Sequence, residues 1–204
     1  MVRTERERVL EAMVRIAARK GYEATTVAEV AAAADISRQR FYELFGNKEA
    51  CFLAAYDAAV DVLLAFVTST FESAAEAPWP DRIVASLRAG IGFLAAEADI
   101  ARMAVVEISS VGEDARIRYR QALMRFIPLL DQGRAASPQG SELPPDTASF
   151  AIGAVTSMIF DEIRAGRATE LPQILPKLAY SVLMPYLGPE AAEAEMARIE
   201  VQEG

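Results

Sequence analysis

The sequence predicts an all-α protein with a small N-terminal domain and a larger C-terminal one. Apolar residues recur with a helical period along the whole chain, and no stretch of useful length alternates apolar and polar residues. Gly, Pro and capping residues divide this pattern into helical segments. Of the 204 residues, 52% are apolar and 25% are charged, a composition typical of a soluble globular protein with a substantial core.

The first helix is predicted from about residue 3 to Lys20. Two cations at its end and the following Gly21 form a typical C-terminal stop. A short second helix is predicted over about residues 26–34, because Thr26 and Glu29 have the spacing of a capping box. Its apolar residues lie on one face of the helix.

A third short helix should follow after a tight connection. Ser37 is its N-cap candidate, Gly46 ends it, and Asn47 caps a long fourth helix over about residues 48–75. Two short helices joined by about three residues have helix-turn-helix geometry. In that geometry, the N-terminal part of the second helix of the pair contacts base edges in the major groove of DNA.

Polar side chains should cover the outer face of the third helix. Ile36, Phe41 and Phe45 can pack inward, which leaves outward Arg38, Gln39, Arg40, Tyr42 and Glu43. Arginine suits guanine and glutamine suits adenine, each through two hydrogen bonds. The pattern therefore favours DNA binding, although Arg38-Gln39-Arg40 taken alone is also typical of a solvated surface turn.

Residues 25–49 read TTVAEVAAAADISRQRFYELFGNKE. This segment resembles the DNA-binding signature of the TetR (tetracycline-repressor-like) family of bacterial transcription regulators. The resemblance implies an all-helical homodimer, with a three-helix helix-turn-helix DNA-binding domain at residues 1–47 and a helical ligand-binding and dimerisation domain at 48–204. The DNA-contacting residues that we predict are Thr26, Ser37, Arg38, Gln39, Arg40, Tyr42 and Lys48.

The resemblance also suggests how these residues divide their roles. Arg38 and Gln39 align with base-reading positions, and Tyr42, Lys48 and Thr26 align with phosphate-facing ones. Lys48 lies at the start of a helix, where a cation is mildly unfavourable, and a phosphate partner would explain that placement. Gln39 stands where a small residue is common in the family. This difference suggests that the protein recognises an operator sequence of its own.

Two further departures from the family pattern affect the turn and the third helix. Asp35 replaces a usual turn glycine, but aspartate tolerates the left-handed region better than most residues, so the turn should survive. Leu44 replaces a frequent histidine, so any contact made by that histidine is absent.

The rest of the chain is predicted to be helical but is less informative. After Pro78-Trp79-Pro80, further helices are expected over about residues 81–97, 100–109, 114–135, 146–167 and 171–187. A loop rich in proline covers about residues 137–145, and a polar tail follows Gly188-Pro189. The nearly all-apolar first half of the helix at 146–167 needs cover on almost every side, and a partner subunit is the natural cover.

Two sets of candidate residues follow for this larger domain. The candidate ligand contacts are Phe66, Met103, Glu107, Tyr119, Leu123 and Met158. The candidate dimer contacts are Phe150, Gly153, Ala154, Ser157, Tyr180 and Leu183. Glu107 lies in an apolar run, where it either lines a cavity or points to solvent. We expect an apolar or amphipathic effector and not a strong polyanion, because the cavity candidates are mainly apolar and the domain is acidic.

Charge and composition narrow the possible functions. The net charge is −8, yet residues 1–57 hold nine basic and nine acidic residues, so the acidity lies in the C-terminal part. A neutral segment can still bind DNA if its cations cluster on one face. There is no His and one Cys, so we expect no catalytic triad, no metal site and no cofactor.

These observations favour a dimeric regulator, usually a repressor, that binds an approximate inverted repeat in double-stranded DNA and responds to a small-molecule effector. Two alternatives stay open: a helical enzyme or carrier with a vestigial helix-turn-helix, and a DNA-binding dimer that takes no ligand. We expect a cytoplasmic protein without a signal sequence or a membrane span, since the longest uncharged stretch is Thr147 to Phe160, fourteen residues.

Overall fold

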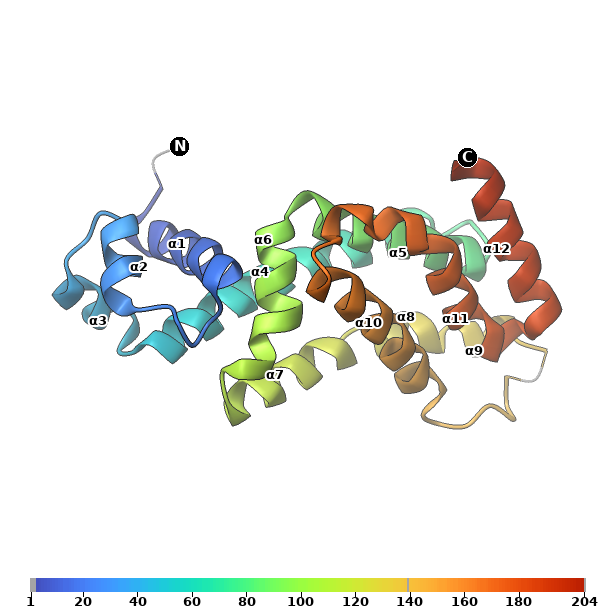
Figure 1. Ribbon diagram of the computed structural model, residues 1–204. Helices are drawn as coiled ribbons and strands as arrows, with labels where there is room; N and C mark the ends of the chain where they lie inside the picture. Colours follow the sequence, from blue (N-terminus) through green and yellow to red (C-terminus); the bar gives the residue numbers. More distant parts are fainter. Residues whose placement is uncertain (1–2, 139, 204) are drawn as a thin grey trace. The chain divides into compact units, whose positions relative to one another are not determined.

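The computed structural model describes residues 3–138 and 140–203, and every regular element among them is a helix (Figure 1). This confirms the predicted all-α class. The chain divides into two compact units, one formed by Met1–Val62 with Glu97–Tyr119 and the other by Leu63–Ala96 with Arg120–Gly204. The first unit therefore extends beyond the predicted domain boundary after residue 47, since it also includes the start of the fourth helix and residues 97–119.

The first unit begins with three helices whose ends follow the local signals in the sequence. They are α1 (Glu5–Lys20), α2 (Val27–Ala33) and α3 (Arg38–Phe45). Capping boxes start α1 at Thr4 and α2 at Thr26, and Gly21 ends α1 with a φ of 87°. Glycine suits this position because a side chain disfavours positive φ.

The core of the first unit joins these helices to the start of α4 (Lys48–Ser73). Val9, Met13 and Ala17 of α1 are fully buried, and so are Cys51 and Phe52 of α4. The Phe52 ring meets the Tyr22 ring edge to face at 5.0 Å. Burial raises the pKa of the Cys51 thiol to about 12, so this cysteine is an unreactive core residue.

The segment predicted as one helix over 100–109 is irregular in the structure. It consists of α6 (Ala98–Ala101), a π-helical turn (Arg102–Val106) and a 3-10 turn (Glu107–Ser110). Met103 and Ile108 of this segment are buried, so side-chain packing helps to hold it in place. Such turns within a helical segment often mark a functional hinge.

The prediction of a single helix over 114–135 is wrong. The structure has α7 (Glu113–Met124), α8 (Ile127–Asp131) and α9 (Gly133–Ala136). Pro128 lies at the start of α8, four residues after the last residue of α7, and a proline cannot donate to the carbonyl of the residue four positions before it. This interrupts the helical ladder where α7 ends.

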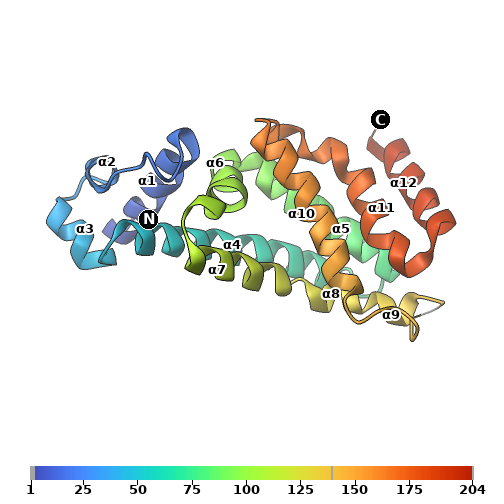
Figure 2. The ribbon, with the colours of Figure 1, turned by 60° about the horizontal axis from the view of Figure 1, so that its bottom comes forward.

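The second unit is built around α11 (Leu175–Leu187), which packs against α5 (Trp79–Ala96), α10 (Thr147–Arg164) and α12 (Pro189–Glu203) (Figure 2). Leu178, Ala179 and Leu183 of α11 are fully buried. The predicted helix over 171–187 is α-helical only from Leu175, because the stretch Ala168–Ile174 forms a 3-10 helix that contains Pro172.

A tryptophan links four helices of the second unit. The Trp79 indole N–H donates to the Leu129 carbonyl at 3.0 Å, and its ring lies 4.9 Å from the Tyr186 ring. Gly133 is necessary here, because a Cβ atom at this position would lie 2.4 Å from the Trp79 ring. The contact thus joins α5, α8, α9 and α11.

The long helix α4 is apolar enough to cross a membrane by length and composition alone, a test that core helices of soluble proteins also pass. The length of the uncharged stretches in the sequence did not indicate this apolar character, because Asp57 and Asp61 interrupt the apolar residues of α4. The first half of α4 buries Cys51, Phe52 and Tyr56 within the first unit, as expected of a core helix.

Candidate nucleic-acid interface

Helices α2 and α3 form a helix-turn-helix unit whose turn is set by one residue in the left-handed region. Asp35 has a φ of 54°, the conformation predicted for it. The Asp35 N–H donates to the Ala32 carbonyl at 3.2 Å, and the Ile36 N–H donates to the Ala31 carbonyl at 3.1 Å. These bonds end α2 and turn the chain into α3, so the aspartate replaces a glycine without loss of the turn.

Local hydrogen bonds also define both ends of α3. The Ser37 hydroxyl accepts from the Arg40 N–H at 3.0 Å and caps the helix. At the other end, the Gly46 N–H donates to the Tyr42 carbonyl at 2.9 Å. Ser37 is therefore the N-cap of α3. A contact between Ser37 and DNA remains a prediction.

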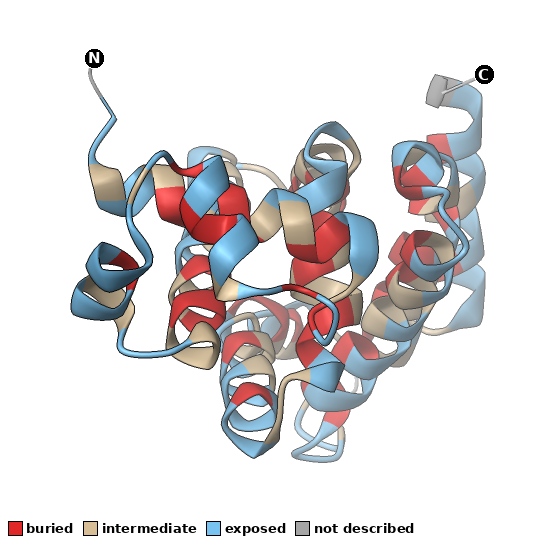
Figure 3. Ribbon diagram, turned by 60° about the vertical axis from the view of Figure 1, so that its left-hand side comes forward, coloured by how far each residue is buried: buried red, intermediate tan, exposed pale blue. Residues whose placement is uncertain are grey.

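The two faces of α3 differ as predicted (Figure 3). Phe41 is 0% exposed, and Ile36 and Phe45 are half-buried. The exposed side chains on the other face are Arg38, Gln39, Arg40, Tyr42 and Glu43. An exposed face with arginine, glutamine and tyrosine can contact both base edges and phosphates.

The exposed polar groups of α3 are not equally available. Among the described residues, Arg38 has no hydrogen-bond or ion-pair partner. The Arg40 guanidinium, by contrast, lies 2.8 Å from a Glu5 carboxylate oxygen and 3.1 Å from one of Glu43. Arg38 is thus the cation of this helix that is free to bind DNA without first breaking an ion pair.

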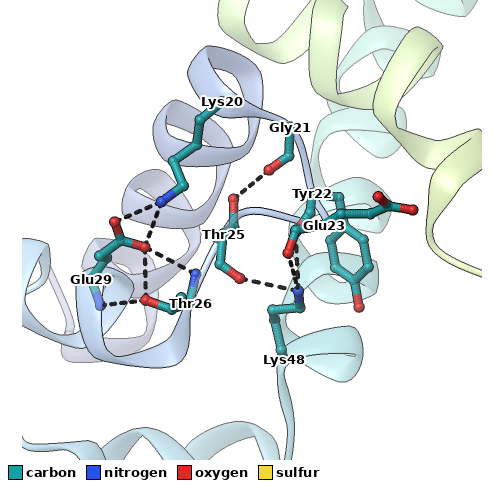
Figure 4. A network of polar contacts seen from close by, with 8 residues as sticks. All are labelled: Lys20, Gly21, Tyr22, Glu23, Thr25, Thr26, Glu29 and Lys48. Carbon is teal, nitrogen blue, oxygen red and sulfur yellow. Dashed lines mark hydrogen bonds and ion pairs between the residues drawn. The ribbon is translucent and has the colours of Figure 1, made fainter.

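Thr26 is engaged in the capping box of α2 (Figure 4). Its hydroxyl donates to a Glu29 carboxylate oxygen at 2.7 Å, and the Lys20 ammonium lies 2.6 and 2.8 Å from the two Glu29 oxygens. The hydrogen bonds from Lys20 and Thr26 lower the pKa of the Glu29 carboxyl to about 2. The box therefore stays intact at neutral pH, and a phosphate contact by Thr26 remains a prediction.

The Lys48 side chain is placed differently from what we expected. Its ammonium donates to the Tyr22 and Thr25 carbonyls, each at 3.0 Å, and to the Glu23 carbonyl at 3.4 Å (Figure 4). It also lies 4.2 Å from the centre of the Tyr22 ring. These carbonyls occupy all three donors of the ammonium. The three carbonyls explain why a cation occupies the start of α4. The position of Lys48 is therefore no longer an argument for a phosphate partner.

Comparison with known proteins agrees with this geometry. Residues 9–55 match the sequence family described as bacterial regulatory proteins, tetR family. The N-terminal segment is thus a DNA-binding sequence of the TetR family. A relative from Bacillus subtilis, the uncharacterised HTH-type transcriptional regulator YerO, is 41% identical over 51 residues, which is 25% of this chain and 18% of that protein. The sequence match is therefore confined to the DNA-binding end.

Solved structures extend the likeness to most of the chain. The fatty acid degradation regulator FadR from Bacillus halodurans has a TM-score of 0.78 at 17% identity, over 90% of this chain and 96% of its own. AibR, solved with isovaleryl coenzyme A and operator DNA, has a TM-score of 0.68 at 21% identity, over 91% of this chain and 99% of its own. At such identities the likeness shows a TetR-type fold.

Glu107 is a candidate residue whose place in the structure the sequence did not reveal. Its carboxylate is buried, accepts from the Tyr22 N–H at 3.1 Å and lies 3.4 Å from the Arg102 guanidinium. We expected Glu107 to line a ligand cavity or to face solvent. Its burial contradicts the second alternative, and the first remains a prediction. Together with Lys48, Glu107 holds the loop that follows α1. The sequence showed only that an acidic residue lies in an apolar run. It could not show that the hydrogen-bond partner, Tyr22, lies 85 residues away.

Replacing Glu107 by alanine is expected to lower the free energy of unfolding by about 1–3 kcal/mol, because the buried Tyr22 N–H loses its acceptor. The matched control Glu107→Gln keeps an acceptor oxygen and should lose less. Urea unfolding followed by circular dichroism measures both variants. Equal losses would mean that the hydrogen bond to Tyr22 does not contribute to stability.

The other ligand candidates are divided between the two units. Met103 and Tyr119 belong to the first unit, and Phe66, Leu123 and Met158 belong to the second. Met103 is fully buried, whereas Phe66 is 52% exposed and its ring centre lies 5.6 Å from that of Phe93. Neither unit alone brings all these residues together, so a shared ligand site remains a prediction.

The dimer candidates lie on α10 and α11. Phe150, Gly153, Ala154 and Ser157 are all exposed, and their spacing places them along one face of α10. Tyr180 is half-buried. Leu183 is 0% exposed within its own unit, so its assignment as a dimer contact is wrong. The helical period of α11 could not show which of its apolar residues face the chain's own core.

Proposed function

We propose that this protein is a dimeric transcriptional regulator that represses by occupying an operator and is released by a small ligand. The exposed face of α3 carries the proposal. It presents Arg38, which has no partner among the described residues, and Gln39 beside it, on a helix whose N-cap and buried Phe41 fix its orientation. The family match at residues 9–55 supports the same role.

Dimerisation would supply the second recognition helix. The exposed stripe Phe150, Gly153, Ala154 and Ser157 on α10 includes a phenylalanine that is 69% exposed, which is costly to leave in water. We propose that a second copy covers this stripe through a two-fold interface, in which both copies use the same surface. The operator is then an approximate inverted repeat.

The effector that we propose is apolar or amphipathic. Release requires that it bind more tightly to a conformer whose two recognition helices are wrongly spaced for DNA. AibR was solved with isovaleryl coenzyme A, which is amphipathic but also polyanionic. For this chain we retain the expectation that the effector is not a polyanion, because its net charge of −8 repels anions.

A screen can test the effector class directly. Thermal shift with apolar, cationic and anionic compounds, with isovaleryl coenzyme A among the anionic ones, should identify stabilising ligands. Each of them is then tested for release of the protein from DNA. Stabilisation and release by apolar or singly charged amphipathic compounds would support the proposal. Release by polyanions alone would contradict the expected effector class.

We expect Arg38→Ala to weaken binding to the operator by about 1–3 kcal/mol and to relax base preference at one position of each half-site. The reason is that a bidentate arginine contact discriminates between bases. Mobility shift with the DNA that flanks the gene, at a stated salt concentration, identifies the operator, and a library of its variants measures the preference. Identical preferences in the wild type and in Arg38→Ala would remove Arg38 from the base-reading residues.

A further inference from the structure

The Glu43 carboxylate lies between two of the residues expected to bind DNA. The Gln39 amide nitrogen donates to one Glu43 oxygen at 3.1 Å, and the Arg40 guanidinium donates to the other at 3.1 Å. All three side chains are exposed on α3. One carboxylate therefore organises two neighbouring side chains on the surface that would face the bases.

The contact with Gln39 fixes which way its amide points. An ionised carboxylate only accepts hydrogen bonds, so the NH₂ group of Gln39, and not its oxygen, must point to Glu43. The hydrogen bonds from Arg40 and Gln39 hold the pKa of the Glu43 carboxyl below its usual value, so it is ionised at neutral pH. The second amide N–H and the carbonyl oxygen of Gln39 have no partner in the part of the chain that the structure describes. This donor and acceptor pair is what adenine requires in the major groove.

The contact with Glu43 makes Arg40 less available to DNA, whereas it leaves Gln39 able to contact a base. Arg40 also donates to Glu5 on α1 at 2.8 Å, so two carboxylates compete with DNA for its guanidinium. Two negative charges and one positive charge leave this cluster net negative. Arg40 is therefore better suited to fix α3 against α1 than to bind a phosphate or a base.

We propose that Glu43 determines specificity: it orients the Gln39 amide for adenine and retains Arg40, so that Arg38 and Gln39 read the bases and Arg40 does not. This inference rests on the proposed function, because it assigns roles within the same DNA-binding surface. It also predicts that the carboxylate repels DNA in general. Loss of Glu43 should then lower specificity while it raises affinity for unrelated sequences.

The experiment compares the full-length wild type with Glu43→Gln, Gln39→Ala and the double variant on a library of operator variants. In Glu43→Gln, the new amide can donate as well as accept, so Gln39 is free to turn over. We expect the wild type to prefer adenine at one half-site position by about tenfold or more, and Glu43→Gln to lose most of that preference. The double variant should match Gln39→Ala in its preference for adenine, because Glu43 affects that preference through Gln39.

Glu23→Gln serves as the matched control for charge. Glu23 is an exposed acid of the same unit, and its side chain has no partner among the described residues. This substitution should raise affinity for all sequences alike and leave the adenine preference intact. A thermal melt of each variant checks folding, and we expect little change, since an exposed pair of this kind on one helix contributes little to stability.

The outcomes separate this inference from the proposed function. Loss of adenine preference in Glu43→Gln, with no further loss in the double variant, supports the inference. A Glu43→Gln protein that keeps the preference, or losses that add in the double variant, would overturn the inference and leave the proposed function standing. A wild type without any sequence preference removes the proposed function, and this inference with it.

Discussion

Replacing Ala154 by arginine is expected to convert the dimer into a monomer and to weaken operator binding by about 100-fold or more. Ala154 lies in the exposed stripe of α10 with Phe150, Gly153 and Ser157. A long charged side chain there blocks close approach of a second copy and places an unpaired charge in an apolar contact. Light scattering measures the mass, and mobility shift with the operator measures the loss of binding.

Ala197→Arg is the matched control for this experiment. Ala197 is an exposed residue of α12 in the same unit, outside the stripe. The control variant should remain dimeric and should bind the operator like the wild type. Two results would contradict the assignment of the interface: a monomeric wild type, or an Ala154→Arg protein that stays a dimer.

We expect Phe41→Ala to lower the free energy of unfolding by about 3–5 kcal/mol and to abolish specific DNA binding. Phe41 is the one buried residue within α3, and its ring lies 5.6 Å from Phe45 and 5.7 Å from Tyr42. A helix of eight residues is not stable in isolation, so its contacts with α1 and α2 must hold it. Urea unfolding gives the loss, and amide hydrogen exchange shows whether α3 is released first.

Ile117→Ala provides the comparison for that measurement. Ile117 is also a large apolar residue of the first unit, but it is 46% exposed. Its truncation should cost well under the loss expected for Phe41, since less apolar area leaves the core. Similar losses at the two positions would show that burial of Phe41 does not hold α3 in place.

The first four helices could be predicted closely because their signals are local. Thr26 with Glu29, Ser37, and the glycines at 21 and 46 all lie within a few residues of the helix ends that they define. The division of α3 into a buried and an exposed face follows from its period, as Phe41 and Arg38 show. For these elements, the sequence alone was sufficient.

Contacts between residues far apart in the chain could not be predicted. The Lys48 ammonium binds carbonyls more than twenty residues earlier, and Glu107 binds the N–H of Tyr22, which is 85 residues away. No periodic pattern records such pairs. The end of α7 before Pro128 could have been predicted, because a proline disfavours a continuous helix. The apolar period continues across this position and favoured a single helix instead.

The loop after α1 limits how freely this DNA-binding domain can be exchanged with that of another regulator. A chimera joined after residue 47 would take Tyr22 away from both Lys48 and Glu107, the groups that bind its carbonyl and its N–H. The transplanted domain would then have unpaired polar groups in that loop unless the host supplies equivalents. A graft that keeps its stability must therefore carry the start of α4 and the segment around Glu107 as well, so the exchangeable module is discontinuous in sequence.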